Sequence, residues 1–191
     1  MPQTEVISRF GVATIAKTTC GEWLRRSKIA AHNCSSSALE SLEVYACPSL
    51  RCFPNGELPT TLKKLYIEDC ENLESLPEGM MHHNSTCLEI LWINGCSSLK
   101  SFPTRELPST IKRLQIWYCS NLESMSENMC PNNSALEYLG LWGYPNLRTL
   151  PDCLHNLKQL CINDCEGLEC FPARGLSTST LTTSNFFVDF L

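Results

Sequence analysis

Two stretches of this chain follow one pattern: Leu62-Lys-Lys-Leu65-Tyr-Ile67-Glu-Asp-Cys70-Glu-Asn-Leu73-Glu-Ser-Leu76-Pro77 and Leu88-Glu-Ile-Leu91-Trp-Ile93-Asn-Gly-Cys96-Ser-Ser-Leu99-Lys-Ser-Phe102-Pro103. The shared pattern is L-x-x-L-x-[IVL]-x-x-C-x-x-L-x-x-[LF]-P. Its six copies are separated by 21 to 26 residues and begin at Leu39, Leu62, Leu88, Ile111, Leu136 and Leu157. A period of this length indicates a solenoid, because one unit cannot bury its apolar face alone and must stack on its neighbours.

The first half of each copy predicts a short β-strand. The fourth and sixth positions, such as Leu65 and Ile67, are apolar and alternate with polar or aromatic residues. A period of two places these apolar residues on one face of a strand. Stacked strands would pair in parallel, and the later Leu and Leu/Phe-Pro positions would close the turn. Chain entropy offsets most of the gain from burial, so several consecutive repeats are needed for a stable stack.

The period and spacing are typical of a leucine-rich repeat. We therefore expect an α/β repeat solenoid, a horseshoe with a parallel sheet on its concave side and a mostly irregular convex side. The expected divisions are a non-repeat leader at 1–36, a domain of six repeats at 37–176, and a degenerate seventh repeat or tail at 177–191. Leu181 to Phe186 is the candidate seventh strand. Neither end has the pattern of a finished cap, which favours a piece of a larger protein or a truncated gene product.

The second position of the repeat alternates in charge along the chain. The six residues are Glu40, Lys63, Glu89, Lys112, Glu137 and Lys158. Adjacent parallel strands would bring these side chains together as a ladder of alternating sign. The alternation has two possible origins, both open: the ladder fixes the register of the strands, or a two-repeat unit was duplicated.

Composition narrows the possible partners and the compartment. The net charge of −5 and the absence of basic runs argue against binding to nucleic acid or an anionic membrane. No apolar stretch approaches the ~18 residues of a membrane helix, and the N-terminus is a poor secretory signal. We therefore expect a cytoplasmic protein.

The placement of the thirteen cysteines argues against a disulfide framework, and the spacing of Cys161, Cys165 and Cys170 fits no zinc pattern. Five of them occupy the ninth repeat position: Cys47, Cys70, Cys96, Cys119 and Cys165. They are predicted to form a buried column of reduced thiols. Cys161 is expected on the concave face and Cys165 inside, and we expect no metal site and no cofactor. Tyr144 replaces the ninth-position cysteine in the fifth copy, and Ser126 replaces the closing proline in the fourth, so these two repeats are expected to be locally looser.

Residues 37–176 resemble the C-terminal repeats of plant intracellular nucleotide-binding leucine-rich-repeat immune receptors of the coiled-coil class. The resemblance rests on L-x-x-L-x-I-x-x-C-x-x-L-x-S-[LF]-P and on the phrases Leu58-Pro-Thr-Thr-Leu62-Lys-Lys-Leu65 and Leu107-Pro-Ser-Thr-Ile111-Lys-Arg-Leu114. It implies a role in the defence response, with a pathogen effector, a host guardee or other receptor domains as protein partners.

A weaker resemblance concerns the phosphate loop that opens the nucleotide-binding domain of the same receptors. Gly11, Lys17 and Thr18 fall at the positions of G-x-x-x-x-G-K-[ST], but Ala16 replaces the second glycine. Added Cβ atoms restrict the turn and crowd the approach of a phosphate. A degenerate remnant and a coincidence both remain open, and a vestigial ADP/ATP switch is an alternative function.

Catalysis has no supporting arrangement of residues, so an enzyme is not expected. The outward strand positions carry aromatic side chains, which are typical of protein contact surfaces. The protein-binding candidates are Tyr45, Tyr66, Glu68, Trp92, Arg113, Trp117, Tyr118, Tyr138 and Trp142, with Glu43, Lys64, Asp69 and Asp164 around them. Two alternatives stay open: the aromatic side chains shield and stabilise the sheet without binding a partner, or the chain is a non-functional gene product.

Overall fold

The computed structural model describes residues 39–53, 58, 60–76, 87–100, 102, 107–123, 125, 129, 134–151 and 154–169, and the backbone of three further strands at 6–7, 12–15 and 186–189. Within these residues the strands form one sheet in chain order. They are β1 Val6–Ile7, β2 Val12–Ile15, β3 Ser41–Tyr45, β4 Lys64–Glu68, β5 Ile90–Asn94, β6 Arg113–Trp117, β7 Tyr138–Trp142, β8 Gln159–Asn163 and β9 Phe186–Asp189. The predicted strand of each of the six repeats is therefore confirmed.

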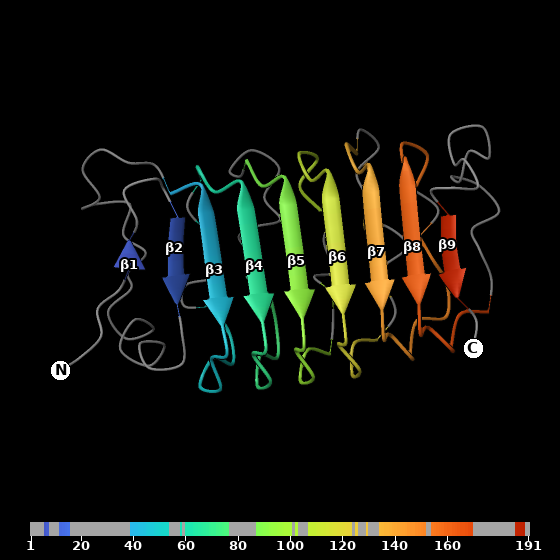
Figure 1. The fold of residues 1–191 in the computed structure, drawn as a ribbon, viewed down its shortest axis with the longest axis horizontal. Coiled ribbons are helices and arrows are strands. Elements are labelled where there is room, and N and C mark those ends of the chain that lie inside the picture. Colours follow the sequence, from blue (N-terminus) through green and yellow to red (C-terminus); the bar gives the residue numbers. More distant parts are fainter. Residues whose placement is uncertain are drawn as a thin grey trace.

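The strands from β2 to β9 run in parallel, and β1 is antiparallel to β2 (Figure 1). The register repeats from one strand to the next. Leu65 lies opposite Leu42 and Leu91, and Leu91 lies opposite Leu114. Equivalent leucines of neighbouring repeats are thus stacked, as the pattern predicts for a parallel solenoid.

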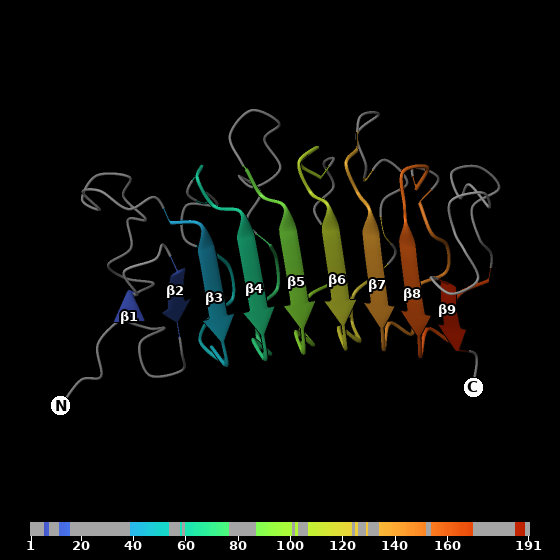
Figure 2. The same cartoon turned by 45° about the horizontal axis from the view of Figure 1, so that its top comes forward.

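The apolar positions of the repeat form one continuous core behind the sheet. Leu65, Leu91 and Leu114 are each 0% exposed, and the isoleucines two residues later are equally buried. The described parts of the connecting segments lie along one side of the sheet, and no backbone of the described residues covers its other side (Figures 1 and 2). The alternation of apolar and polar residues therefore decides which side of each strand meets the core.

The described residues contain strands, turns and irregular segments but no helix. In this part of the chain the structure is a parallel β-solenoid, and the α/β horseshoe expected from the repeat is not confirmed. None of the described residues belongs to a helix with the length and apolarity needed to cross a bilayer. Of the candidate strand Leu181 to Phe186, only Phe186 lies among the described residues, at the start of β9.

The alternating charges at the second repeat position form separate pairs instead of a continuous ladder. The ion pairs are Glu40–Lys63 at 2.8 Å, Glu89–Lys112 at 3.3 Å and Glu137–Lys158 at 2.8 Å. Each joins an odd repeat to the even repeat that follows it. Among the described residues, no ion pair joins Lys63 to Glu89 or Lys112 to Glu137.

Side-chain hydrogen bonds also join neighbouring repeats. The hydroxyls of Thr61 and Thr110 donate to the carbonyls of Leu39 and Leu88, at 2.9 and 2.8 Å. The Asn156 amide donates to the Ser134 carbonyl at 2.7 Å. These contacts join the first repeat to the second, the third to the fourth, and the fifth to the sixth. Other side-chain hydrogen bonds cross from one ion-paired couple of repeats to the next: the Asn94 amide donates to Oε1 of Glu68 at 3.2 Å, and the Asn146 amide donates to the Ser120 carbonyl at 2.9 Å. The two-repeat grouping therefore belongs to the ion pairs, whereas side-chain hydrogen bonds occur both within and between these couples.

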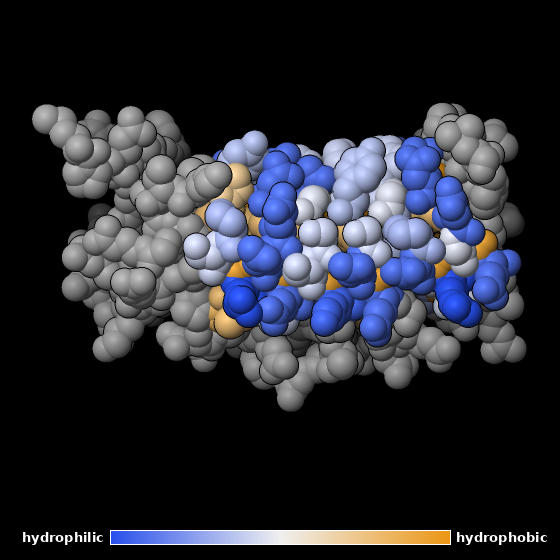
Figure 3. All heavy atoms as spheres, turned by 90° about the horizontal axis from the view of Figure 1, so that it is seen from below, coloured by the Kyte–Doolittle hydropathy of each residue, from blue (hydrophilic) through white to orange (hydrophobic). Residues whose placement is uncertain are grey.

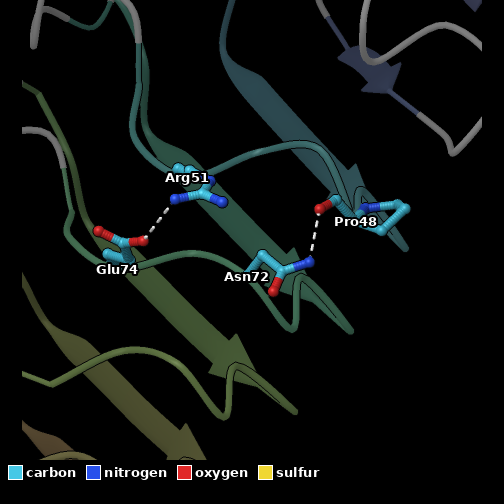
Figure 4. Close-up of polar contacts among 4 residues, drawn as sticks. All are labelled: Pro48, Arg51, Asn72 and Glu74. Atoms are coloured by element: carbon cyan, nitrogen blue, oxygen red, sulfur yellow. Dashed lines mark hydrogen bonds and ion pairs between the residues drawn. The ribbon is translucent and has the colours of Figure 1, made fainter.

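A second row of alternating charge, at the thirteenth repeat position, was not predicted. Its members are Arg51, Glu74, Lys100, Glu123, Arg148 and Glu169. Arg51 pairs with Glu74 at 3.4 Å, beside the hydrogen bond from Asn72 to the Pro48 carbonyl at 2.8 Å (Figure 4). Arg148 pairs with Glu169 at 3.8 Å. The same two-repeat grouping thus occurs in the turns that follow the strands, at an edge that is mostly hydrophilic (Figure 3).

Two glycines allow close contacts between the second and third repeats and between the fourth and fifth. The residue that follows each of the strands β3 to β8 has a positive φ, from 48° at Ala46 to 65° at Gly95. A Cβ on Gly95 would lie 2.5 Å from Oδ1 of Asp69, and a Cβ on Gly143 would lie 2.5 Å from the Tyr118 ring. Glycine at these two positions therefore provides space for the side chain of the preceding repeat, as well as tolerating the left-handed conformation.

Candidate functional site

The side chains of β3 to β8 that point away from the core form what we call the open face of the sheet. These side chains come from the third, fifth and seventh repeat positions. They form three rows that run across the strands. Eight predicted binding residues lie on this face: Tyr45, Tyr66, Glu68, Trp92, Arg113, Trp117, Tyr138 and Trp142.

Four aromatic side chains on the open face form a continuous row, Tyr66–Trp92–Trp117–Trp142, which we call the aromatic row. Their successive ring centroids are 5.7, 5.3 and 4.5 Å apart. Each contact is edge-to-face, with interplanar angles of 75° to 88°. Tyr66 lies directly opposite Trp92, and Trp117 lies directly opposite Trp142. The step from β5 to β6 is diagonal, because Trp92 lies opposite Gln115 in the strand register. Aromatic side chains that were scattered through the sequence are thus brought into one cluster.

The two central tryptophans of the aromatic row have buried indole N–H groups. Nε1 of Trp92 and Nε1 of Trp117 are buried and have no hydrogen-bond partner within the described structure. Edge-to-face geometry is the arrangement in which an N–H group can use a neighbouring ring face as a weak acceptor. The rings themselves are half-buried, so part of their apolar surface still faces solvent. The aromatic row therefore supplies rigid apolar surface with few free polar groups.

Tyr45 and Tyr118 are the most exposed large hydrophobic side chains in the described residues, at 47% and 58%. Tyr45 ends β3 on the open face. Tyr118 follows β6 instead of lying within it, and its φ is 51°. Its ring packs beside Gly143 at the edge where the strands end. Tyr118 thus extends the aromatic surface onto this edge.

Arg113 and Tyr138 form a stacked pair next to the aromatic row. The guanidinium carbon of Arg113 lies 4.4 Å from the centroid of the Tyr138 ring, a distance typical of a cation–π contact. Tyr138 in turn lies over Gly140, where an added Cβ would be 3.0 Å from its ring. Partial burial, followed by a hydrogen bond with Cys161, raises the pKa of Tyr138 to about 12. The phenol is therefore neutral at physiological pH and supports the Arg113 side chain.

The sequence reasoning missed Gly140 as a part of this site, and it placed Cys161 on this face without predicting its contact with Tyr138. Gly140 is a glycine inside a strand pattern, which is a known indication of a bulge or of close approach by another group. That signal was present in the sequence, although it did not reveal which side chain would approach. Cys161 does lie on the open face and Cys165 in the core, as predicted.

The buried cysteine column is confirmed in the described residues. The thiols at the ninth position are free and buried, and each donates to the carbonyl two residues earlier at 3.4 to 3.5 Å. Burial raises the pKa of Cys165, which favours the neutral thiol. Within the described residues, no group of three or more His, Cys, Asp or Glu side chains could hold a metal ion. The five thiols belong to the same buried core as the leucines and isoleucines of the repeat.

Gly11, Lys17 and Thr18, the residues of the phosphate-loop resemblance, lie outside the described residues. Val12–Ile15, between Gly11 and Lys17, form β2 and pair in parallel with β3. An extended strand in a sheet differs from a loop that curls around a phosphate. A comparison with models of known protein families gives no match to this chain. No curated protein matches it significantly.

Proposed function

We propose that this chain is a non-catalytic protein-binding module of the leucine-rich-repeat type, which contacts its partner through the open face. The observation that carries the proposal is the aromatic row, whose half-buried rings lie on a sheet fixed by the core behind it. Aromatic side chains held rigidly lose little conformational entropy on binding and are enriched among hot-spot residues. Arg113 and Glu68 beside the row would contribute to the choice of partner.

The resemblance to plant immune receptors suggests which process and which partners this binding would serve. We propose a recognition or regulatory role in the defence response, in the cytoplasm, with a pathogen effector, a host guardee or another receptor domain as the partner. The sequence pattern supports this assignment, and the parallel solenoid is compatible with it. The competing hypothesis is that the aromatic row only stabilises the sheet.

Three substitutions separate these two hypotheses: Trp92→Ala, Trp117→Ala and Trp142→Ala. Peptides would be selected from a phage-displayed random library on the immobilised chain and then synthesised. Their Kd values would be measured by fluorescence anisotropy against the wild type and each variant. Because hot-spot truncations cost about 2 kcal/mol or more, each variant is expected to weaken binding by at least about tenfold.

Arg51→Ala is the matched control, since Arg51 lies in a turn beyond the sheet and pairs with Glu74. It should change the Kd by less than about twofold, because exposed ion pairs contribute little. Circular dichroism would verify that each tryptophan variant keeps the wild-type fold. Unchanged Kd values for all three folded tryptophan variants would show that the aromatic row has a stabilising role alone.

A further inference from the structure

Among the residues that the structure describes, Arg113 differs from most of the positively charged side chains in having no carboxylate partner. The described residues contain eight Lys and Arg side chains: Arg51, Lys63, Lys64, Lys100, Lys112, Arg113, Arg148 and Lys158. Five of them pair with a glutamate within 4 Å. In this part of the chain, Lys64, Lys100 and Arg113 have no such partner. Lys64 and Arg113 lie in the same row of the open face, and Lys100 lies at the turn edge.

The surroundings of Arg113 hold its side chain in place without neutralising its charge. Its neighbours in the same row are Ile90 on β5 and Tyr138 on β7, and neither is acidic. One face of the guanidinium packs on the Tyr138 ring at 4.4 Å. Stacking on a ring leaves the N–H groups at the rim of the guanidinium free to donate hydrogen bonds in its plane. Arg113 itself is exposed.

We infer that Arg113 is a carboxylate-binding position on the open face, which receives an Asp or Glu side chain of the protein partner. This inference rests on the proposed protein-binding function, because carboxylates are the anions that a protein surface offers. A planar guanidinium binds a carboxylate through two parallel hydrogen bonds, and the ring beneath it reduces the ordering needed. Lys64, two strands away at roughly 9.6 Å, adds positive charge to the same row.

The strand geometry also fixes where the partner's apolar contact would fall. Arg113 and Trp117 are on the same face of β6, four residues apart, which is roughly 13 Å along a strand. A partner segment extended along β6 would place an acidic residue at Arg113 and an apolar residue four positions away at Trp117. The preferred partner segment is therefore acidic at one position and aromatic or aliphatic at the fourth residue beyond it.

Two short peptides test this inference: acetyl-Glu-Gly-Ser-Gly-Trp-amide and the same peptide with Gln in place of Glu. Binding would be followed by NMR through the Arg113 Nε–H and Trp117 indole signals during titration to millimolar peptide. The Glu peptide is expected to bind about two- to fivefold more tightly than the Gln peptide, which is the contribution of an exposed ion pair. Added NaCl should reduce this preference.

Arg113→Gln should abolish the preference for Glu over Gln, and Lys100→Gln should preserve it. Lys100→Gln is the matched control, because it removes the same charge from an exposed side chain with no ion pair in the described chain. Equal binding of the two peptides to the wild type, or a preference that survives Arg113→Gln, would overturn the inference. If both peptides shift the Trp117 signal equally, the inference fails while the proposed function of the open face stands. If neither shifts either signal, the inference also fails, and the tryptophan variants above decide the proposed function separately.

Discussion

Leu91→Ala is expected to lower the free energy of unfolding by about 3 kcal/mol, within the 2–5 kcal/mol typical of buried leucines. Leu91 is 0% exposed and lies at the centre of the stack, opposite Leu65 on one side and Leu114 on the other. Truncation would remove apolar contacts from three consecutive repeats and leave a cavity between them. Urea unfolding followed by circular dichroism would measure the loss.

The adjacent residue provides the control for this prediction. Ile90 precedes Leu91 on β5 but points to the open face, where it is only half-buried. Ile90→Ala removes similar apolar volume and should cost no more than about 1 kcal/mol, because less surface returns to water. Equal losses for the two variants would contradict the assignment of alternate residues to opposite faces of β5.

Tyr144→Cys is expected to destabilise the chain by about 2–4 kcal/mol, although it restores the cysteine found at this position in the other five copies. Tyr144 is 0% exposed and is the largest fully buried side chain in the described residues. Its ring fills space within the cysteine column. A cysteine would leave much of that space empty, and the cost of a cavity grows with its volume. The free energy of unfolding from urea titration is again the measurement.

Tyr144→Phe separates the ring from its hydroxyl. The Tyr144 hydroxyl is buried without a hydrogen-bond partner in the described structure, and burial raises the pKa of this phenol. An unsatisfied buried hydroxyl costs about 1–3 kcal/mol, so the phenylalanine variant should be at least as stable as the wild type. A loss of more than about 1 kcal/mol would show that the hydroxyl has a favourable partner. The fifth repeat was expected to be locally looser because Tyr144 replaces the cysteine. The Tyr144 ring is completely buried, and the looser packing stays a prediction that these two variants address.

The repeat pattern was sufficient to predict the strands, their parallel order and the buried positions. Leucines and isoleucines spaced two apart can share a face only in an extended strand, and a fixed period repeats the same register. The cysteine column followed for the same reason, because one repeat position has one environment throughout a stack. The α/β horseshoe could not be settled in this way, since the segments between strands lack the regular apolar spacing that identifies a helix.

The details of the candidate site depended on side-chain geometry that spacing does not contain. The sequence placed Trp92 and Trp117 outward, but their different rows on β5 and β6 make the contact diagonal. The sequence showed that Lys63 lies between Glu40 and Glu89 at the second repeat position. It did not show that, among the described residues, Lys63 would form an ion pair with Glu40 and not with Glu89. Side-chain length and rotamer decide such choices between two equally spaced neighbours.

Methyl–methyl nuclear Overhauser effects among Leu65, Leu91 and Leu114 test the central claim most directly. The solenoid places these three side chains one above the next, on parallel strands separated by roughly 4.8 Å. We expect strong cross-peaks from Leu65 to Leu91 and from Leu91 to Leu114, with a soluble paramagnetic probe broadening the signals of the exposed Tyr45 ring but not these methyl signals. Absence of both cross-peaks in the folded chain, or equal broadening of the leucine methyls, would contradict the stacked core and the open face built upon it.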